Sequence, residues 1–385
     1  MERQTFIEQI KRLEVTNMEA AGLSQDQLAL RASIDAMVKG DQAGCIKNLK
    51  TVYQGQGDAE LKGISAQLLF QQLFWDDRFQ EIAELGLTAD VAVDASYRAI
   101  ALQLEKTQGR NPQYGADLHK DQLKLSISGS PIVDVVINGH AKSFWLDTGA
   151  LLSVLSQETA DLCGVVVREE DKLTVESSTD EQTQTTFGTV DRIQVGNFSA
   201  ENTPFIILST EALTISDPSI ETIKIEGIIG WDLIKYLDMN LDYKNGQYEI
   251  RKPVLKPELK KNLLMDGYVM VQLQSKEGHD LCFGLDTGAN RTSFNTPLIG
   301  KVGIEDIDKE VSKVGGVGGF REIERGIIQD LSLSINGTPV HFAEMRSSAH
   351  SPCDFFEVDG VLGSDIGQDG GMRIDYLNRW FELVR

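Results

Sequence analysis

One seven-residue segment occurs twice in the chain, and this duplication limits the fold more than any other feature of the sequence. Residues 144–150 read FWLDTGA, and residues 283–289 read FGLDTGA. Two further short elements recur in the same order at almost the same spacing: GIIG at 227–230 and GVLG at 360–363, then LDY at 241–243 and IDY at 374–376. Because three elements repeat in one order, the sequence predicts two homologous lobes.

The duplicated part of the chain has the residue pattern of β-strands. From Leu123 onward, short alternating apolar runs are separated by Gly, Asn and Asp, and one of them ends in the hairpin signal Asn138-Gly139. Two prolines mark residues 252–262 as a linker. We therefore expect two all-β lobes on either side of this linker, over residues 123–251 and 263–385.

The beginning of the chain has a different pattern. Apolar residues recur there at helical spacing, as at Phe6, Ile7 and Ile10. The pair Gly40-Asp41 is echoed by Asp76-Asp77 after 36 residues, which is close to the period of tetratricopeptide helix pairs. The sequence thus predicts a multidomain α plus β protein, in which an α-helical, repeat-like module over residues 1–115 precedes the two β-lobes.

The composition argues against several kinds of function. The formal net charge of -21 disfavours binding to nucleic acid and to anionic membranes. The 4 cysteines and 5 histidines have no spacing typical of a zinc site or a redox pair. No apolar run is long enough for a transmembrane helix. We therefore expect no metal, no cofactor, no nucleic-acid partner and no membrane span.

The repeated Asp-Thr-Gly tripeptide carries the expected chemistry. In each copy an apolar run predicts a buried strand, and an aspartate, Asp147 or Asp286, comes where that strand breaks into a turn. Gly149 and Gly288 allow a tight backbone at these turns. Two carboxyls that face each other cannot both ionise easily, so they share one proton. One of them can then act as a general base on a water molecule and the other as a general acid.

On these residues, the part from Leu123 to Arg385 resembles the pepsin and retropepsin clan of aspartic proteases, and its LDTGA form is similar to the retropepsin side. The resemblance implies an aspartic endopeptidase that acts on peptide or protein substrates. Asp147 and Asp286 would be its catalytic dyad, and the two lobes would form a pseudodimer that needs no second chain. The residues that would support the two catalytic loops, with interlocking threonines, are Thr148, Gly149, Ala150, Thr287, Gly288 and Ala289.

The resemblance also implies two flaps, which are hairpins whose tips close over a bound peptide. The glycine-rich candidate lies in lobe two and consists of Gly315, Gly316, Val317, Gly318 and Gly319. Its counterpart in lobe one is a polar stretch that begins with Ser177, Ser178 and Thr179. The tyrosine of pepsin-type flaps has no counterpart in either candidate, so we expect the two flaps to differ.

The chain departs from the family pattern beside each catalytic loop. Retropepsins typically place Arg after the supporting Gly-apolar-apolar-Gly segment, whereas this chain has Trp231 and Ser364. The usual salt bridge of that Arg is therefore not expected, and Asp232 and Asp365 would cap the short helices that follow. The residue after each Asp-Thr-Gly is alanine instead of serine or threonine. Loss of that hydroxyl donor predicts a pH optimum nearer neutral than that of pepsin.

The sequence leaves alternative functions open. The chain could be a catalytically silent peptide-binding or scaffold protein that keeps the fold. It could also be a latent protease, blocked by the helical module or by residues 108–120 until activation. The helical module could recruit a protein partner. We expect a cytoplasmic location, with export open if a leader peptide has been removed, because residues 1–13 are charged and amphipathic.

Overall fold

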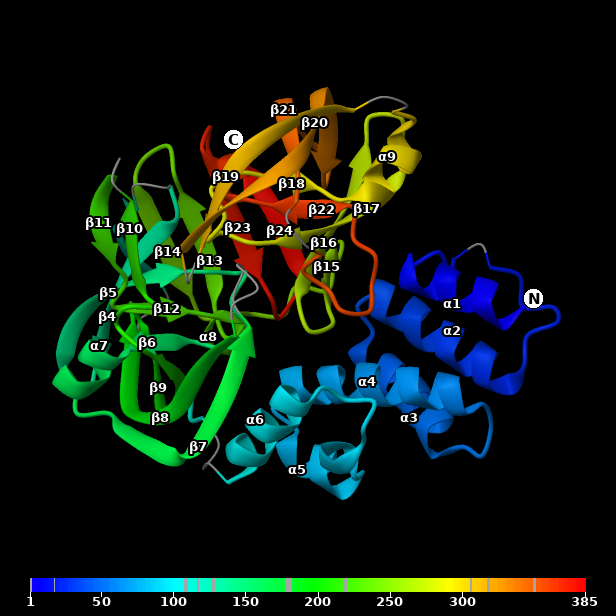
Figure 1. Cartoon of the computed structure of the whole chain (residues 1–385), viewed down its shortest axis with the longest axis horizontal. Helices are drawn as coiled ribbons and strands as arrows, with labels where there is room; N and C mark the ends of the chain where they lie inside the picture. Colours follow the sequence, from blue (N-terminus) through cyan, green and yellow to red (C-terminus); the bar gives the residue numbers. More distant parts are fainter. Residues whose placement is uncertain are drawn as a thin grey trace.

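The computed structural model describes residues 2–16, 18–106, 110–115, 118–126, 129–176, 182–217, 220–304, 307–316, 319–348 and 351–385. Helices come first in the chain, and two β-barrel lobes follow (Figure 1). The expected α plus β class and the two β-lobes are confirmed. Among the helices that these ranges contain, none is long and apolar enough to cross a membrane.

Among the described residues, six α-helices form the N-terminal module, hereafter the helical module. They are α1 (Arg3–Lys11), α2 (Gln25–Val38), α3 (Gln42–Gln54), α4 (Ala59–Trp75), α5 (Phe79–Glu84) and α6 (Ala95–Glu105). Four of them begin at a residue whose side chain accepts a hydrogen bond from a free backbone N–H of the first turn: Ser24, Asp41, Asp58 and Asp94. These caps explain why the helices start where they do. The relation of the module to tetratricopeptide repeats stays a prediction.

In the part of lobe one that the structure describes, there are seven principal strands and two short helices. The strands are β4 (Pro131–Ile137), β5 (His140–Leu146), β6 (Val154–Ser156), β7 (Val166–Glu176), β8 (Gln182–Val195), β9 (Phe198–Leu208) and β12 (Gly227–Ile229). The helices are α7 (Gln157–Leu162) and α8 (Trp231–Ile234). Short strands β1 (Gln113–Tyr114) and β3 (Lys124–Leu125) pair with β9 and β4.

Lobe two repeats this order strand by strand. Its strands are β15 (Leu263–Met265), β16 (Val269–Ser275), β17 (Asp280–Leu285), β18 (Ser293–Phe294), β19 (Asp308–Gly316), β20 (Gly319–Ile335), β21 (Thr338–Ser347) and β22 (Gly360–Leu362). Helix α9 (Thr296–Val302) and the 3-10 turn η2 (Ser364–Gly367) complete the lobe. In both lobes the last of these strands pairs in parallel with the strand that ends just before the Asp-Thr-Gly segment, as β12 with β5 and β22 with β17.

The lobes differ in the connection that precedes this last strand. Lobe one has the hairpin of β10 (Thr214–Asp217) and β11 (Ile220–Lys224). Lobe two has an irregular segment, residues 351–359, which contacts the helical module. The backbone N–H of Glu357 donates to the carbonyl of Lys11 at 2.8 Å, and Arg12 forms an ion pair with the carboxylate of Glu357 at 3.0 Å. The helical module therefore contacts lobe two through a segment that differs from the corresponding connection of lobe one.

A separate sheet joins the two lobes. Its strand order is β2 (Leu118–Gln122), β14 (Gln247–Arg251), β13 (Asp238–Asp242), β23 (Gly371–Asp375) and β24 (Trp380–Val384). The central strands β13 and β23 run antiparallel, with Asn240 opposite Arg373. Strand β2 is therefore an outer strand of this interlobe sheet. It includes part of residues 108–120, the segment that the sequence offers as a possible blocking element.

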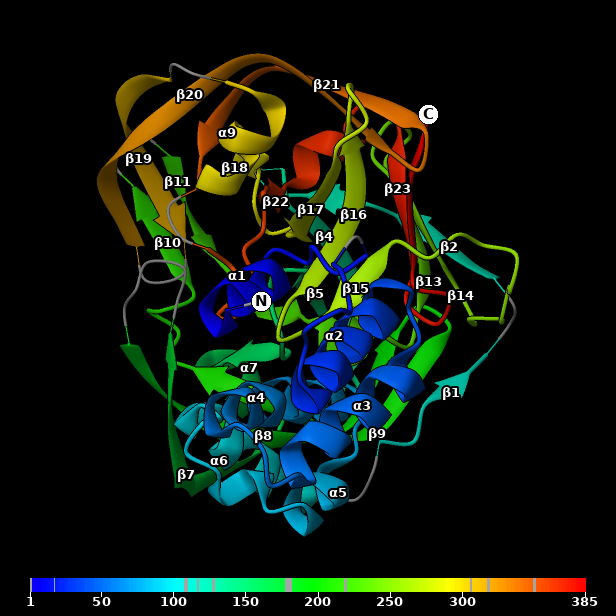
Figure 2. The same ribbon diagram turned by 90° about the vertical axis from the view of Figure 1, so that its right-hand side faces the viewer.

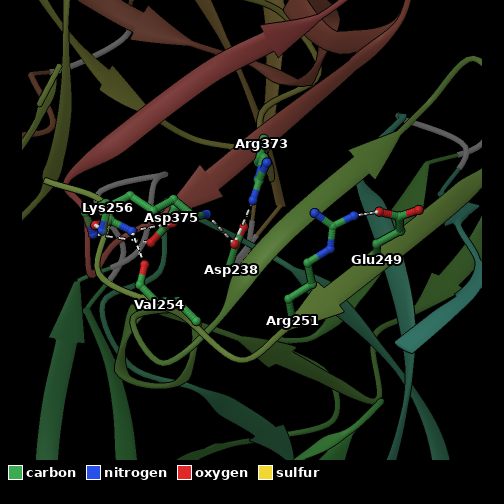
Figure 3. Close-up of polar contacts among 8 residues, drawn as sticks. Asp238, Glu249, Arg251, Val254, Lys256, Arg373 and Asp375 are labelled. Carbon is green, nitrogen blue, oxygen red and sulfur yellow. Dashed lines mark hydrogen bonds and ion pairs between the residues drawn. The ribbon is translucent and has the colours of Figure 1, made fainter. Parts of the chain in front are cut away.

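Charged side chains fix the linker to the interlobe sheet (Figure 3). The guanidinium of Arg373 donates to both carboxylate oxygens of Asp238, at 2.9 and 2.7 Å. The ammonium of Lys256, within the linker, lies 3.2 Å from Asp238 and 3.3 Å from Asp375. The side-chain amide of Asn378 donates to the carbonyl of Val254 at 2.8 Å. Because two buried carboxylates are paired in this way, the linker is part of the lobe interface.

The helical module packs against the side of the two lobes that faces the viewer in Figure 2. Trp75, at the end of α4, belongs to the apolar core cluster of the lobes. The carbonyl of Gly40, between α2 and α3, accepts a hydrogen bond from Lys261 at 2.9 Å. The side chain of Gln72 donates to the carbonyl of Met265 at 2.6 Å. These contacts make one packed body from the three parts of the chain.

Candidate active site

The catalytic loops begin where two buried strands end. Strand β5 ends at Leu146 and β17 at Leu285, and both leucines are fully buried. The backbone N–H of Asp147 donates to the carbonyl of Ile229 at 3.0 Å, and that of Asp286 donates to the carbonyl of Leu362 at 2.9 Å. The repeated Gly-apolar-apolar-Gly segments therefore hold each aspartate at the end of its strand.

The two loops meet face to face. A Cβ atom added to Gly149 would lie 2.6 Å from the carboxyl carbon of Asp286, and one added to Gly288 would lie 2.7 Å from the carboxyl carbon of Asp147. Real Cβ atoms do not approach other atoms so closely, because this is well inside van der Waals contact. Each carboxyl thus lies against the glycine of the opposite lobe, and only glycine allows this approach.

The carboxyls share a hydrogen-bonded environment. The N–H of Gly149 donates to Oδ1 of Asp147 at 2.8 Å, and the N–H of Ala289 donates to Oδ1 of Asp286 at 2.9 Å. Burial raises the pKa of Asp147. Burial and the negative charge of Asp147 raise the pKa of Asp286 well above its usual value. The pair can therefore hold one proton between its members, and its titration belongs to both carboxyls together.

Two fully buried threonines lock the loops to each other. The backbone N–H of Thr148 donates to Oγ1 of Thr287 at 3.0 Å, and the backbone N–H of Thr287 donates to Oγ1 of Thr148 at 2.8 Å. The hydroxyl of Thr287 also donates to the carbonyl of Leu146 at 2.6 Å. Each lobe thus supplies an acceptor that the other lobe needs, since a buried N–H left without a partner is costly.

Behind the lobe-one loop, Asp232 organises a second set of hydrogen bonds. Its Oδ1 accepts from the N–H of Ser153 at 2.8 Å and from the Ser153 hydroxyl at 2.7 Å. The Ser153 Oγ accepts in turn from the N–H of Gly230 at 3.1 Å. The prediction that Asp232 caps the following helix is wrong, because α8 begins after Gly230 without a side-chain cap.

Lobe two repeats this arrangement with a different hydroxyl residue. Oδ1 of Asp365 accepts from the N–H of Thr292 at 3.0 Å and from its hydroxyl at 2.7 Å, and the N–H of Gly363 donates to the Thr292 Oγ1 at 3.0 Å. The turn η2 likewise has no side-chain cap, so the capping prediction is wrong for Asp365 as well. Both carboxylates brace the catalytic loop instead of a helix end.

Trp231 and Ser364 stand where retropepsins carry arginine, and both contact a catalytic loop. The indole N–H of Trp231 donates to the carbonyl of Thr148. The hydroxyl of Ser364 donates to the carbonyl of Ala289 at 3.1 Å. Loop support therefore persists without the family's arginine, in a different form in each lobe.

Two residues that the sequence analysis did not single out lie close to this machinery. Arg110 donates to Asp232 at 2.9 Å and 3.0 Å from its two terminal nitrogens. Tyr268 is buried in lobe two, and a Cβ added to Gly284, two residues before Asp286, would lie 2.7 Å from its ring. Burial raises the pKa of Tyr268, and the dyad carboxylates add to the rise. Neither residue belongs to a repeated motif, so the sequence carried no signal for it.

Apolar side chains beside the catalytic loops continue into the helical module. On β5, Phe144 and Leu146 face the core of the lobes, whereas Trp145 lies on the opposite face of the strand. Trp145 and Tyr268 belong to one buried apolar cluster with residues of the helical module, among them Phe74. The module therefore shares its core with the walls next to the dyad.

The flap candidates are described in part. Ser177, Ser178 and Thr179 lie outside the described residues, and so do Val317 and Gly318. The flanking glycines of lobe two form a regular hairpin, with Gly315 opposite Phe320 and Gly316 opposite Gly319 at the end of β19 and β20. The described glycines, Gly315, Gly316 and Gly319, thus lie at the end of a long two-stranded ribbon.

The described part of the chain contains no group of three or more His, Cys, Asp or Glu side chains that could hold a metal ion. Its four cysteines are buried and unbridged. The groups that the structure brings together at this site are the carboxyls of Asp147 and Asp286.

Comparison with known proteins matches part of this arrangement. Residues 133–233 match the family model described as aspartyl protease. The matched interval covers lobe one from β4 to α8 and includes Asp147, Thr148, Gly149 and Asp232. A search of curated proteins found no match.

Proposed function

Because the chain has the architecture of a retropepsin-like aspartic protease with two lobes and an N-terminal helical region, we propose that it is an aspartic endopeptidase. Its substrate is a peptide or protein, and the Asp147/Asp286 dyad activates the attacking water. One observation carries the proposal: each carboxyl packs against the glycine of the opposite loop, 2.6 and 2.7 Å from the position of a Cβ. This placement brings one carboxyl from each lobe to a common point.

The proposed reaction uses the two carboxyls in different protonation states. Burial raises the pKa of both carboxyls, so the pair holds one proton: one carboxyl is protonated and the other is ionised. The ionised carboxyl removes a proton from the water as the water oxygen adds to the peptide carbonyl, while the protonated carboxyl donates its proton to the carbonyl oxygen. The first carboxyl then donates the proton it has gained to the amide nitrogen, the second takes a proton back from a hydroxyl of the tetrahedral intermediate, and the C–N bond breaks to give an acid and an amine. No covalent bond to the enzyme and no cofactor is involved.

The hairpin of β19 and β20 is proposed to cover the bound peptide. The described glycines at the end of this hairpin, Gly315, Gly316 and Gly319, carry no side chain that would keep the backbone of an extended substrate away. The cytoplasmic location, the protein partner of the helical module and the activity of a single chain also remain predictions of this proposal.

The direct experiment is a cleavage assay on a diverse peptide mixture between about pH 3 and pH 8, a range that brackets the expected titration of the dyad. Mass spectrometry would identify the cut sites. Asp147→Asn and Asp286→Asn would be compared with the wild type, and Asp369→Asn, an exposed carboxyl, would serve as control. We expect both dyad variants to lose cleavage and the control to keep it. Cleavage that survives in either dyad variant would refute the assignment.

A second candidate function is latency, which the apolar cluster shared by Trp145, Tyr268 and the helical module favours. In a latent enzyme this packing would keep peptides from the dyad. A peptide that carries a hydroxyl-bearing tetrahedral carbon in place of the scissile amide mimics the tetrahedral intermediate. Its binding would distinguish a silent binding protein from a latent enzyme. Binding without cleavage of ordinary peptides would support a silent binding protein, and neither binding nor cleavage would support latency.

A further inference from the structure

Arg110 is a buried cation at the junction of the helical module and lobe one. Its side chain is 7% exposed. One terminal nitrogen donates to the backbone carbonyl of Asp232 at 2.9 Å, and the other donates to its carboxylate at 3.0 Å. A guanidinium that contacts one residue at two points in this way fixes both its position and its orientation.

The same guanidinium faces the helical module. It lies 3.6 Å from the carboxylate of Asp77, in the turn between α4 and α5. Lys235 contacts that carboxylate at 2.7 Å and Tyr236 at 2.5 Å, both from the end of α8. Burial alone would raise the pKa of Asp77, but Lys235 and Arg110 outweigh it and hold the pKa below its usual value. Two cations and two carboxylates thus form one network between the module and lobe one, which is buried except at Asp77, whose side chain is 31% exposed.

This network ends at the catalytic loop. Asp232, which Arg110 contacts, accepts both hydrogen bonds of Ser153, and Ser153 in turn accepts from Gly230. The next residue, Trp231, donates its backbone N–H to the carbonyl of Ala150 at 2.9 Å. A continuous path of polar contacts therefore runs from Asp77 in the helical module to the loop that carries Asp147.

In lobe two the bracing carboxylate makes the same contacts with the catalytic loop, but it lacks the connection to the helical module. Asp365 holds Thr292 as Asp232 holds Ser153. Within the described residues no ion pair joins Asp365 to a lysine or arginine, and Arg291 acts on its pKa only through its charge. The module is thus connected through a buried ion pair to one catalytic loop and not to the other.

We infer that Arg110 is a positioning residue that couples the helical module to the lobe-one catalytic loop. Without Arg110, Asp232 would be a buried carboxylate that lacks its ion-pair partner, which is strongly destabilising, whereas Asp77 would keep Lys235 and Tyr236. Asp232 would then shift or take up a proton, and its grip on Ser153 would weaken. The loop of Asp147 would loosen while the loop of Asp286 would not. The catalytic consequence of this inference rests on the proposed function, whereas the structural consequence does not.

The test uses the full chain with Arg110→Met, Arg110→Lys and Asp77→Asn. Hydrogen exchange of backbone amides, followed by mass spectrometry, would compare residues 147–154 with residues 286–293. Lys301→Met is the matched control, because Lys301 pairs at 2.9 Å with Asp359, a fully buried carboxylate of lobe two that lies outside both loops. Steady-state kinetics on a cleaved peptide and the pH profile of kcat would be measured in parallel.

For Arg110→Met we expect exchange in 147–154 to rise about tenfold or more, with little change in 286–293. We expect kcat to fall about tenfold or more with a small change in KM, since the loop and not the peptide-binding surface is disturbed. Arg110→Lys should recover part of the effect, because an ammonium keeps the charge but not the two-point contact. Asp77→Asn should act in the same direction and less strongly.

Three results would overturn the inference: equal exchange changes in both loops, no change in either loop, or an equal change in the Lys301→Met control. Any of them would reduce Arg110 to a general structural role. If the wild type cuts no peptide, the proposed function fails, but the exchange comparison still decides whether Arg110 couples the module to one loop.

Discussion

The two lobes agree where they form the dyad and differ where they meet the rest of the chain. Each lobe ends a buried strand at aspartate, locks it with a threonine and braces the loop with a carboxylate that accepts from a hydroxyl residue, Ser153 or Thr292. Behind lobe one this carboxylate reaches the helical module through Arg110. Lobe two instead contacts the module through Glu357 and helix α1. The shared chemistry constrains only the contacts between these carboxylates and the loops that they brace. The contacts between each lobe and the helical module can therefore differ.

The largest effect should come from the glycines that let the carboxyls meet. Gly149→Ala and Gly288→Ala would place a Cβ within 2.6 or 2.7 Å of the opposite carboxyl carbon. The loops must then separate, and a misplacement of about 1 Å costs about 10²-fold in rate. We expect a loss of this size or more in kcat for both variants, with the fold retained.

The control for the glycine variants is Gly300→Ala in α9, where an added Cβ meets no atom within 4 Å. Activity should be unchanged in this variant. Full activity in Gly149→Ala or Gly288→Ala would contradict the close approach of the two loops.

The threonine lock offers a sharper comparison between the lobes. Thr148→Val and Thr287→Val each remove an acceptor from a buried N–H, which costs about 1–3 kcal/mol of unfolding free energy. Thr287→Val should cost more, because its hydroxyl also donates to Leu146 at 2.6 Å. Urea unfolding would measure both values, and Thr51→Val, on an exposed part of α3, would be the control. Negligible losses would show that the lock contributes little, and equal losses would show that the hydrogen bond from Thr287 to Leu146 adds nothing to it.

The dyad itself should make stability depend on pH. A carboxyl whose pKa is raised in the folded state stabilises the fold below its unfolded pKa, and this contribution is lost as the pH rises through the folded value. Burial and the negative charge of Asp147 raise the pKa of Asp286 well above its usual value. Asp286→Asn cannot ionise, so it should be more stable than the wild type at pH 8 and gain less at pH 4. The gain should grow by no more than about 1.4 kcal/mol per pH unit for one proton. A constant difference across this range would contradict the raised pKa.

The smallest effect concerns the replacements for the retropepsin arginine. Trp231→Phe removes the indole N–H that donates to Thr148, and Ser364→Ala removes the hydroxyl that donates to Ala289. Each hydrogen bond is worth about 0.5–1.5 kcal/mol. Thermal unfolding should show a larger loss for Trp231→Phe, since that carbonyl belongs to a fully buried residue. The reverse order would indicate that lobe two depends more on its own replacement.

The sequence predicted the features of the fold and of the site whose residues it repeats. The duplicated Asp-Thr-Gly segments predicted the two-lobe fold and named the residues that the structure brings together at the dyad. The prediction that Asp232 and Asp365 cap helices was wrong, although the sequence contained a signal for the partners that they have. Ser153 and Thr292 stand at the same position after each catalytic aspartate, and this repeated hydroxyl pointed to a partner elsewhere in the lobe.

The remaining contacts could not have been predicted, because they depend on packing between parts that are distant in sequence. Arg110 lies 122 residues before Asp232 and belongs to no repeat. Trp75 ends a helix whose last turns are buried almost completely. Helical periodicity predicted the helical module, but only the contact of this helix with the lobes explains why its last turns are buried on all sides.

The central claim is that one chain supplies both carboxyls of the dyad, and a mixing experiment tests it most directly. Asp147→Asn and Asp286→Asn would be assayed separately and after combination, including unfolding and refolding together. If the dyad forms within one chain, every molecule in the mixture lacks one carboxyl. The mixture should then stay as inactive as its components, and the wild-type rate should rise linearly with protein concentration. Recovery of activity in the mixture would show that the dyad forms between two chains and would contradict the account.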